Sequence, residues 1–239
     1  MQKNPKVTVI MPAYNAEKYI AFAIESILKQ TFKDFEFIII NDCSTDKTKE
    51  IITKYQKKDN RIVLVNNETN LKIAKTLNKG IHLAKGKYIA RMDADDWSYP
   101  YRLEKQVKHM DKNPNTVLLS GKMQICDGDM NIRKTSNFPI NNNEILNAIL
   151  QYNPLVSPAM MWRKQPSLDI QGFKENTITE DYMFVLDMSQ KGELHNLDDV
   201  LIKYRVVDSS MTSTKMRGSH LSSINVSITG HLKYNYPLT

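Results

Sequence analysis

The feature that most constrains the fold is a regular alternation of apolar runs and amphipathic stretches through the first 96 residues. Four apolar runs predict buried strands at Val7–Met11, Phe35–Ile40, Ile62–Val65 and Lys87–Met92. Apolar residues recur at helical spacing between these runs, which predicts helices over 17–30, around Ile51, Ile52 and Tyr55, and across Ile73, Leu77, Ile81 and Ala84. Apolar strands that alternate with helices are typical of a parallel sheet covered on both faces. We therefore predict an α/β fold.

The second half of the chain is less regular. We expect a helix over 102–111, a strand over 116–120, a helix over 182–190 that stops before Gly192, and a late strand over 200–205. Prolines at positions 154, 158 and 166 mark an irregular middle segment. A chain of 239 residues can bury one large α/β core. We interpret the whole chain as one domain with a nucleotide-binding half and a more variable second half.

The position of the first glycine excludes the nucleotide-binding motifs that use an early Gly-rich loop. That residue is Gly80, whereas Gly-rich phosphate loops need glycines directly after an early strand so that backbone N–H groups can approach the phosphate. If the sheet binds a nucleotide, another group must neutralise the phosphates. A divalent cation held by carboxylates, Mg²⁺ or Mn²⁺, is the substitute that we expect.

Carboxylates follow two of the predicted strands. Asp42 comes directly after the second strand, and Asp93, Asp95 and Asp96 follow the fourth. Ligands of open α/β sheets bind beyond the C-terminal ends of the strands, where these side chains would meet. Residues two apart in an extended chain point the same way, so Asp93 and Asp95 could address one cation while Asp96 turns aside. The alternative is that these residues only cap helices or end strands.

The net charge and the cysteines limit the kinds of partner and the cellular compartment that we expect. The net charge is +7, and residues 71–91 carry six basic residues and no acid. Such a balance favours an anionic partner, such as a diphosphate or an anionic membrane surface; nucleic acid is not expected, because no basic–aromatic stripe appears. Two cysteines without metal or redox spacing, and no apolar stretch of membrane-spanning length, favour a cytoplasmic protein.

Four stretches carry a resemblance to a known family. They are VIMPAYNAEKYI, FIIINDCSTDKT, NLKIAKTLNKGIHLAKGKYIARMDADD and TEDYMFVLDMSQKG. Over residues 6 to about 207 the chain resembles family 2 glycosyltransferases. The resemblance implies a GT-A fold: a Rossmann-like, mostly parallel central sheet with helices on both faces and a smaller acceptor-side region. It also implies a nucleotide-sugar-binding half over 1–98, an acceptor-binding and catalytic-base half over 99–207 and a basic tail over 208–239.

The resemblance implies roles for individual residues. Pro12, Ala13 and Tyr14 would line the uracil and ribose pocket, Asp42 would hydrogen-bond the uracil, Asp93 would contact the ribose, Asp95 would ligate Mn²⁺ or Mg²⁺, and Asp181 would be the catalytic base. Lys75 is a candidate for the diphosphate, with placement on the surface as the alternative. Glu180 and Trp162 would lie on the acceptor side. From the residues alone, Tyr14 could equally be a core aromatic, and a buried aromatic is the favoured interpretation of Trp162. The Glu180–Asp181 pair could simply complement a helix dipole.

The implied activity is an inverting transfer of a hexosyl or N-acetylhexosaminyl group from a nucleotide-sugar, in particular a UDP-sugar. The acceptor would be a glycan or lipid-linked saccharide of bacterial surface polysaccharide synthesis, such as lipopolysaccharide or capsule, with peripheral contact at the inner face of the plasma membrane. Two departures from the family pattern stand out. Lys72 occupies a position where many relatives have glycine, and Val207 occupies the position of a late histidine that lies near the metal in relatives, so that either the metal lacks that ligand or Asp208 replaces it.

Two alternative functions remain open at this point. One is a nucleotide-sugar-binding partner protein without catalysis. The other is a Mg²⁺-dependent phosphatase of the haloacid-dehalogenase type. The phosphatase would need its D-x-D motif on the first strand, with Thr or Val where Trp97 stands.

Overall fold

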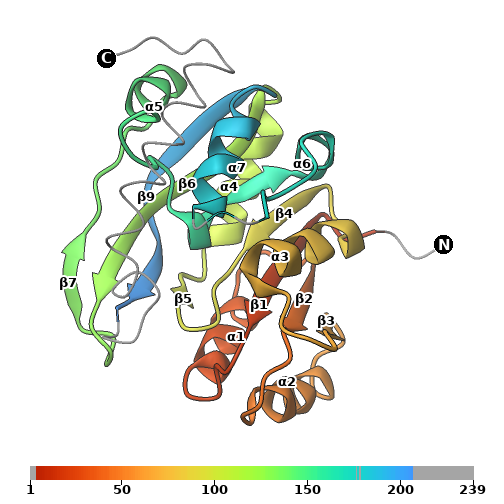
Figure 1. Ribbon diagram of the computed structural model, residues 1–239. Helices are drawn as coiled ribbons and strands as arrows, with labels where there is room; N and C mark the ends of the chain where they lie inside the picture. Colours follow the sequence, from red (N-terminus) through yellow and green to blue (C-terminus); the bar gives the residue numbers. More distant parts are fainter. Residues whose placement is uncertain (1–3, 176, 178, 207–239) are drawn as a thin grey trace.

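One sheet of nine strands runs through the protein (Figure 1). The computed structural model describes residues 4–175, 177 and 179–206. The strands lie in the order β3-β2-β1-β4-β8-β6-β9-β5, with β7 paired to β6. Their bounds are β1 Val7–Ala13, β2 Phe35–Asn41, β3 Ile62–Asn66, β4 Tyr88–Arg91, β5 Trp97–Ser98, β6 Thr116–Cys126, β7 Ile132–Thr135, β8 Met161–Arg163 and β9 Glu193–Arg205.

The first four strands form the parallel half that the sequence predicts. β1 pairs in parallel with β2 and with β4, and β3 extends the sheet beyond β2. β8 is antiparallel to both β4 and β6, while β9 is parallel to β6. Six of the nine described strands therefore run in one direction, and the expectation of a mostly parallel α/β sheet is confirmed.

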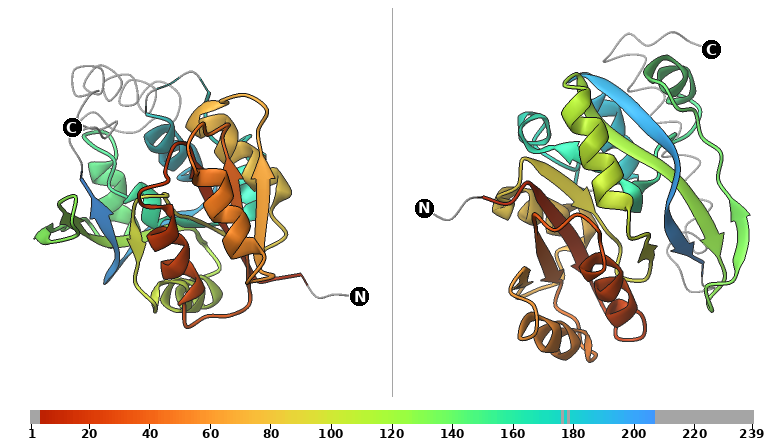
Figure 2. Two further views of the ribbon diagram at one scale, coloured as in Figure 1. Left: turned by 90° about the horizontal axis from the view of Figure 1, so that it is seen from below. Right: turned by 180° about the vertical axis from the view of Figure 1, so that it is seen from behind.

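Helices cover both faces of the sheet (Figure 2). Their bounds are α1 Ile20–Leu28, α2 Thr48–Gln56, α3 Lys72–Leu83, α4 Arg102–Lys112, α5 Asn142–Ala148, η1 Ser157–Ala159, α6 Lys164–Asp169 and α7 Glu180–Met188. The alternation of side chains along β1 separates two cores: Ile10 packs with α3 and α7, whereas Val9 and Met11 pack with α1 and α4. The helices on both faces are confirmed.

The second half contains elements that the sequence does not predict, and longer versions of those it does. The expected strands over 116–120 and 200–205 are parts of β6 and β9, which pair along most of their lengths. The short strands β5, β7 and β8 and the helices α5 and α6 are not predicted. Pairing of Trp97 with Lys203 and of Ser98 with Ile202 joins the segment after Asp96 to β9.

Some expectations fall outside the described residues. The basic tail over 208–239, with Asp208, is among them, as is Val207. Within the described part of the chain, no helix combines the length and apolar character needed to span a bilayer.

At Gly86 the segment before β4 passes very close to the backbone of β1. A Cβ on Gly86 would lie 2.5 Å from the Thr8 nitrogen and 2.7 Å from the Val7 carbonyl carbon. These atoms belong to β1, which is paired on both sides and has little freedom to move. We expect Gly86→Ala to lower the free energy of unfolding by about 1–3 kcal/mol, the usual cost of overpacking.

Urea unfolding of Gly86→Ala beside Gly80→Ala measures this effect. At Gly80 the nearest atoms belong to the side chains of Ile10 and Ile40, with Ile10 Cγ2 at 2.6 Å, so a side chain rather than the backbone must shift. Alanine also gains about 1 kcal/mol of helix propensity over glycine, which offsets part of that cost. Gly86→Ala should therefore be the less stable variant. Equal stability of the two variants would contradict this account of the contact between β1 and the segment before β4.

Candidate functional site

The C-terminal ends of β1, β2 and β4 lie side by side at one edge of the sheet. Ala13 is in register with Asn41, and the Asp42 N–H donates to the Ala13 carbonyl at 2.8 Å. The Met92 N–H donates to the Ile10 carbonyl at 2.9 Å. The segments that carry Tyr14, Asp42 and Asp93 therefore leave the sheet next to one another, as the strand order requires.

Tyr14 is 51% exposed, so the alternative of a core aromatic is wrong for this residue. Pro12 and Ala13 before it are buried. Asn15 follows with a φ of +47°, and its side-chain oxygen accepts the Thr45 N–H at 2.9 Å. This contact joins the loops after β1 and β2 and leaves Tyr14 at the surface, available to a flat ligand.

Asp42 organises the loop after β3. Its carboxylate accepts hydrogen bonds from the Asn67 amide (2.7 Å) and from the backbone N–H groups of Leu71 (2.8 Å) and Lys72 (3.0 Å). Lys72 has a φ of +68°, in the left-handed region that favours glycine. The loop thus adopts a glycine-type backbone although the side chain is lysine.

Lys75 lies on the surface. Its Nζ is 3.5 Å from an oxygen of Glu175, and about half of each side chain is exposed. The surface alternative is the one observed, and contact between Lys75 and a diphosphate stays a prediction.

The three carboxylates after β4 have different environments. Asp93 is paired with Arg91, whose Nε and Nη2 donate to its two oxygens at 2.9 and 3.2 Å. Asp96 is fully buried, and its Oδ1 accepts the Arg205 N–H at 2.9 Å. Its other oxygen has no hydrogen-bond partner among the described residues. Burial, followed by the charges of Asp95 and Asp93, raises the pKa of Asp96 well above its ordinary value. The structure thus agrees with the expectation that Asp96 turns aside.

Asp95 is the carboxylate best suited to a cation. It is partly exposed, and burial together with the charge of Asp93 raises its pKa to about 6. A divalent cation would offset exactly those two unfavourable effects, because it favours the charged form. No group of three His, Cys, Asp or Glu side chains converges as a metal cage within the described ranges. Mg²⁺ needs only one or two carboxylates when substrate phosphates complete its shell, so the residues fit such an ion.

Glu180 and Asp181 form the first turn of α7. An Asp181 oxygen accepts the Tyr182 N–H at 2.8 Å. Both carboxylates act electrostatically on Arg91: burial lowers the pKa of that guanidinium, but the charge and hydrogen bond of Asp93 and the charges of Asp181 and Glu180 outweigh burial, so the net pKa is raised. The carboxylates at the start of α7 therefore act on the same guanidinium that pairs with Asp93.

Trp162 is a buried aromatic, the interpretation that its residue type favours, and the expected place on the acceptor side is wrong. The side chain is fully buried and packs edge-on against Phe173 and Phe184, with ring centroids 6.0 and 5.1 Å away. It cannot stack on an acceptor sugar, because β8 is paired on both sides and directs this ring into the core. Trp97 also packs against an aromatic ring, that of Phe22, with ring centroids 4.2 Å apart.

Three buried arginines surround the acidic segment and were not singled out from the sequence. Arg91 forms the ion pair with Asp93. Arg205 donates from Nε to the Asp95 carbonyl at 2.9 Å, and its guanidinium lies 4.3 Å from the Tyr19 ring. Arg102, fully buried, donates to the Arg91 carbonyl at 2.7 Å, and burial lowers its pKa to about 9. The only available signal was a basic residue two positions before Asp93.

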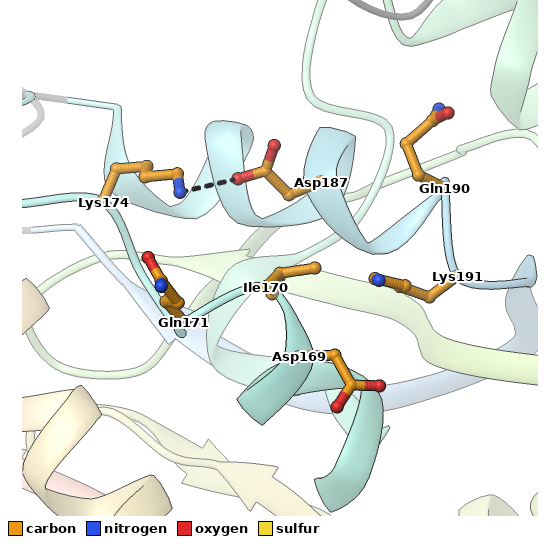
Figure 3. Close-up of a pocket in the computed structure, with 7 residues that line it drawn as sticks. All are labelled: Asp169, Ile170, Gln171, Lys174, Asp187, Gln190 and Lys191. Carbon is orange, nitrogen blue, oxygen red and sulfur yellow. Dashed lines mark ion pairs between the residues drawn. The ribbon is translucent and has the colours of Figure 1, made fainter.

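A separate hollow of about 320 Å³ lies between α6 and the C-terminal part of α7 (Figure 3). Lys174 and Asp187 form an ion pair across it at 3.6 Å. Asp181 is at the opposite end of α7, so this hollow is not the place where the predicted site residues meet.

Comparison with known proteins agrees with this arrangement. Residues 8–170 match the profile of the family described as Glycosyl transferase family 2. The chain is 32% identical over 211 residues to the O-antigen biosynthesis glycosyltransferase WbnJ of Escherichia coli, which covers 85% of this chain and 81% of WbnJ.

Two solved structures share the fold. TarS of S. aureus in complex with UDP-GlcNAc superposes with a TM-score of 0.73 and 25% identity, covering 87% of this chain and 61% of that chain. The mannosyltransferase PcManGT of Pyrobaculum calidifontis, in complex with GDP-Man and Mn²⁺, gives a TM-score of 0.73 and 18% identity, covering 95% and 65%. The chain thus spans less than two thirds of either solved chain, and its fold is GT-A.

Asp95 should destabilise the metal-free protein at neutral pH. Its pKa of about 6 in the fold exceeds the ordinary value of 3.8, so the folding penalty is fully present above pH 6 and is lost as the pH falls from 6 towards 4. With EDTA present, we expect Asp95→Asn to raise the free energy of unfolding by about 1–3 kcal/mol at pH 7.5 and to leave it nearly unchanged at pH 4.

Urea unfolding at the two pH values measures this effect, with Asp46→Asn as the control of opposite sign. Burial raises the pKa of Asp46, but hydrogen bonds from Thr48 and Glu17 outweigh it and lower the pKa overall, so that substitution should destabilise at pH 7.5. If Asp95→Asn were less stable than wild type at pH 7.5, the expected destabilisation by the ionised Asp95 carboxylate would be contradicted.

Proposed function

The chain belongs to glycosyl transferase family 2 and is a glycosyltransferase; from that premise we propose that it transfers a sugar from a UDP-sugar to an acceptor hydroxyl in the synthesis of a surface polysaccharide. The observation that carries this proposal is the convergence of two acidic groups on Arg91. Asp93 forms an ion pair with it directly after β4, and the charges of Asp181 and Glu180 act on it from the start of α7. The phosphatase alternative is excluded, because the D-x-D motif follows the fourth strand and the family is a different one.

The donor would bind across the ends of β1, β2 and β4. Tyr14 offers an exposed ring to the uracil, with Pro12 and Ala13 beneath the loop that carries it. Asp42 would complete the base pocket, both through its carboxylate and through the loop that it holds. Two neighbours in fold support a nucleotide-sugar donor, since TarS binds UDP-GlcNAc and PcManGT binds GDP-Man.

Asp95 would hold Mn²⁺ or Mg²⁺, and Asp93 would contact the ribose. The ion, when bound, would offset the negative charge of the departing nucleoside diphosphate. The raised pKa of Asp95 and the Mn²⁺ in the PcManGT complex support this assignment. No Gly-rich loop is available to hold the phosphates, because the first glycine of the chain lies in α3.

Asp181 would act as the general base on the acceptor side, with Glu180 beside it. The acceptor oxygen forms a bond to the anomeric carbon while the bond from that carbon to the diphosphate breaks, which inverts the configuration. Asp181 takes the acceptor proton in the same step, a contribution of typically 10²–10⁴-fold in rate. The O-antigen role of the relative WbnJ supports a saccharide acceptor, which we propose to be lipid-linked.

Donor class and metal dependence are tested together by a thermal-shift screen. We expect a UDP-sugar with Mn²⁺ to raise the melting temperature by several degrees, because a ligand at about 100 times its dissociation constant stabilises by about 2.7 kcal/mol. EDTA should abolish the shift, and GDP-mannose should give a smaller one. Stabilisation by the UDP-sugar that persists in EDTA would contradict the metal assignment.

The role of Asp181 is tested by Asp181→Asn. We expect the turnover number to fall by about 10²–10⁴-fold while the affinity for UDP and Mn²⁺ stays within about twofold of wild type. Glu50→Gln is the matched control, since Glu50 is exposed in the first turn of α2, where its charge complements the helix dipole. Turnover near wild type in Asp181→Asn would favour the helix-dipole reading of that carboxylate. A wild-type protein that binds the donor but transfers nothing would favour the non-catalytic partner.

A further inference from the structure

Arg91 connects three segments that are distant in sequence. Its side chain at the end of β4 is only 7% exposed. Nε and Nη2 donate to the two oxygens of Asp93, and Nη1 donates to the Ser157 hydroxyl at 2.6 Å. Ser157 begins η1, in the irregular segment before β8. One guanidinium thus holds both the donor-side carboxylate and a segment of the second half.

The same guanidinium is close enough to the start of α7 for its carboxylates to act on it. Asp181 and Glu180 both act electrostatically on it, in addition to Asp93. A positive charge among three carboxylates from two elements offsets repulsion that would otherwise push Asp93 and Asp181 apart.

The backbone of Arg91 is fixed, which limits where its side chain can point. Its N–H donates to the Met160 carbonyl at 3.0 Å, and its own carbonyl accepts from Arg102 at 2.7 Å. Arg102 is fully buried and also bonds Gln106. The guanidinium therefore starts from a rigid point and has little freedom to follow its partners.

We propose that Arg91 is a positioning residue: its planar fork fixes Asp93 on the donor side against Ser157 of η1, and its charge keeps the Glu180–Asp181 pair near the same end of the sheet. This inference rests on the proposed function, since it concerns the geometry between donor and base. The planar fork of arginine serves Asp93 and Ser157 at the same time, whereas lysine would supply only the charge, at one point.

The chain offers a matched control. Arg61 pairs with Asp59 through the same two nitrogens, Nε at 3.0 Å and Nη2 at 2.7 Å, and the two residues are also two positions apart. Arg61 lies between α2 and β3 and stacks on Phe35, away from Asp181. An effect of Arg91 that Arg61 does not share belongs to the position and not to the type of ion pair.

The first test is a double-mutant cycle on thermal stability in EDTA, which needs no substrate. Arg91→Met should lower the melting temperature, and Asp181→Asn should recover about 2–4 °C more in that background than in wild type, because the uncompensated carboxylate is then removed. The cycle of Arg61→Met with Asp181→Asn should be additive. Arg91→Gln, which keeps a donor for Ser157, replaces Arg91→Met if that variant does not fold.

The second test is a comparison of turnover number with donor affinity. Arg91→Met should lower the turnover number by about 100-fold, the typical cost of a misplaced reacting group, and weaken binding of UDP with Mn²⁺ by about tenfold. Arg91→Lys restores the charge but not the fork, so it should recover most of the turnover number and little of the affinity. Arg61→Lys and Arg61→Met should change neither quantity per folded molecule.

The outcomes separate the two proposals. An additive cycle between Arg91 and Asp181, with unchanged turnover per folded molecule, would overturn the positioning role while wild-type transfer stands. If the wild-type protein neither binds nor transfers a UDP-sugar, the proposed function is overturned. The proposed role of Arg91 is then overturned as well, because it depends on that function.

Discussion

Acidic groups crowd one end of the sheet, and buried arginine is what allows them to stay there. Two like charges about 4 Å apart repel by about 4 kcal/mol near a protein surface, a large share of the roughly 5–15 kcal/mol that stabilises a domain. Asp93, Asp95 and Asp96 lie within four positions, and α7 adds Glu180 and Asp181. Arg91 offsets part of this charge, while burial, followed by the charges of neighbouring aspartates, raises the pKa of Asp95 and of Asp96.

The fold places this charge by pairing distant strands. The segment after Asp96 pairs through β5 with β9, so that Arg205 at the end of β9 reaches the backbone of Asp95 and the side chain of Asp96. β8 fills the gap between β4 and β6 and brings η1 to Arg91. Both halves of the chain thus contribute to one edge of one sheet, which is what a reaction between two bound substrates requires.

The sequence was sufficient wherever an element carries its own signal. Strands β1 to β4 are apolar runs separated by helices, and the meeting of Asp42 and Asp93 at one edge follows from their parallel order. β5 and β8 have two and three residues and exist only because partners far along the chain pair with them. For the same reason the contacts of Arg91 could not be predicted, since they depend on where η1 falls. The burial of Trp162, by contrast, is the interpretation that the residue type alone favours.

A crystal structure of the protein with a UDP-sugar and Mn²⁺, with anomalous data at the manganese edge, tests the central claim most directly. We predict one anomalous peak at about 2.1 Å from an oxygen of Asp95, with the diphosphate on its other side and Asp181 facing the anomeric carbon. A peak remote from Asp95, or a donor bound with Asp181 turned away from its sugar, would contradict the account.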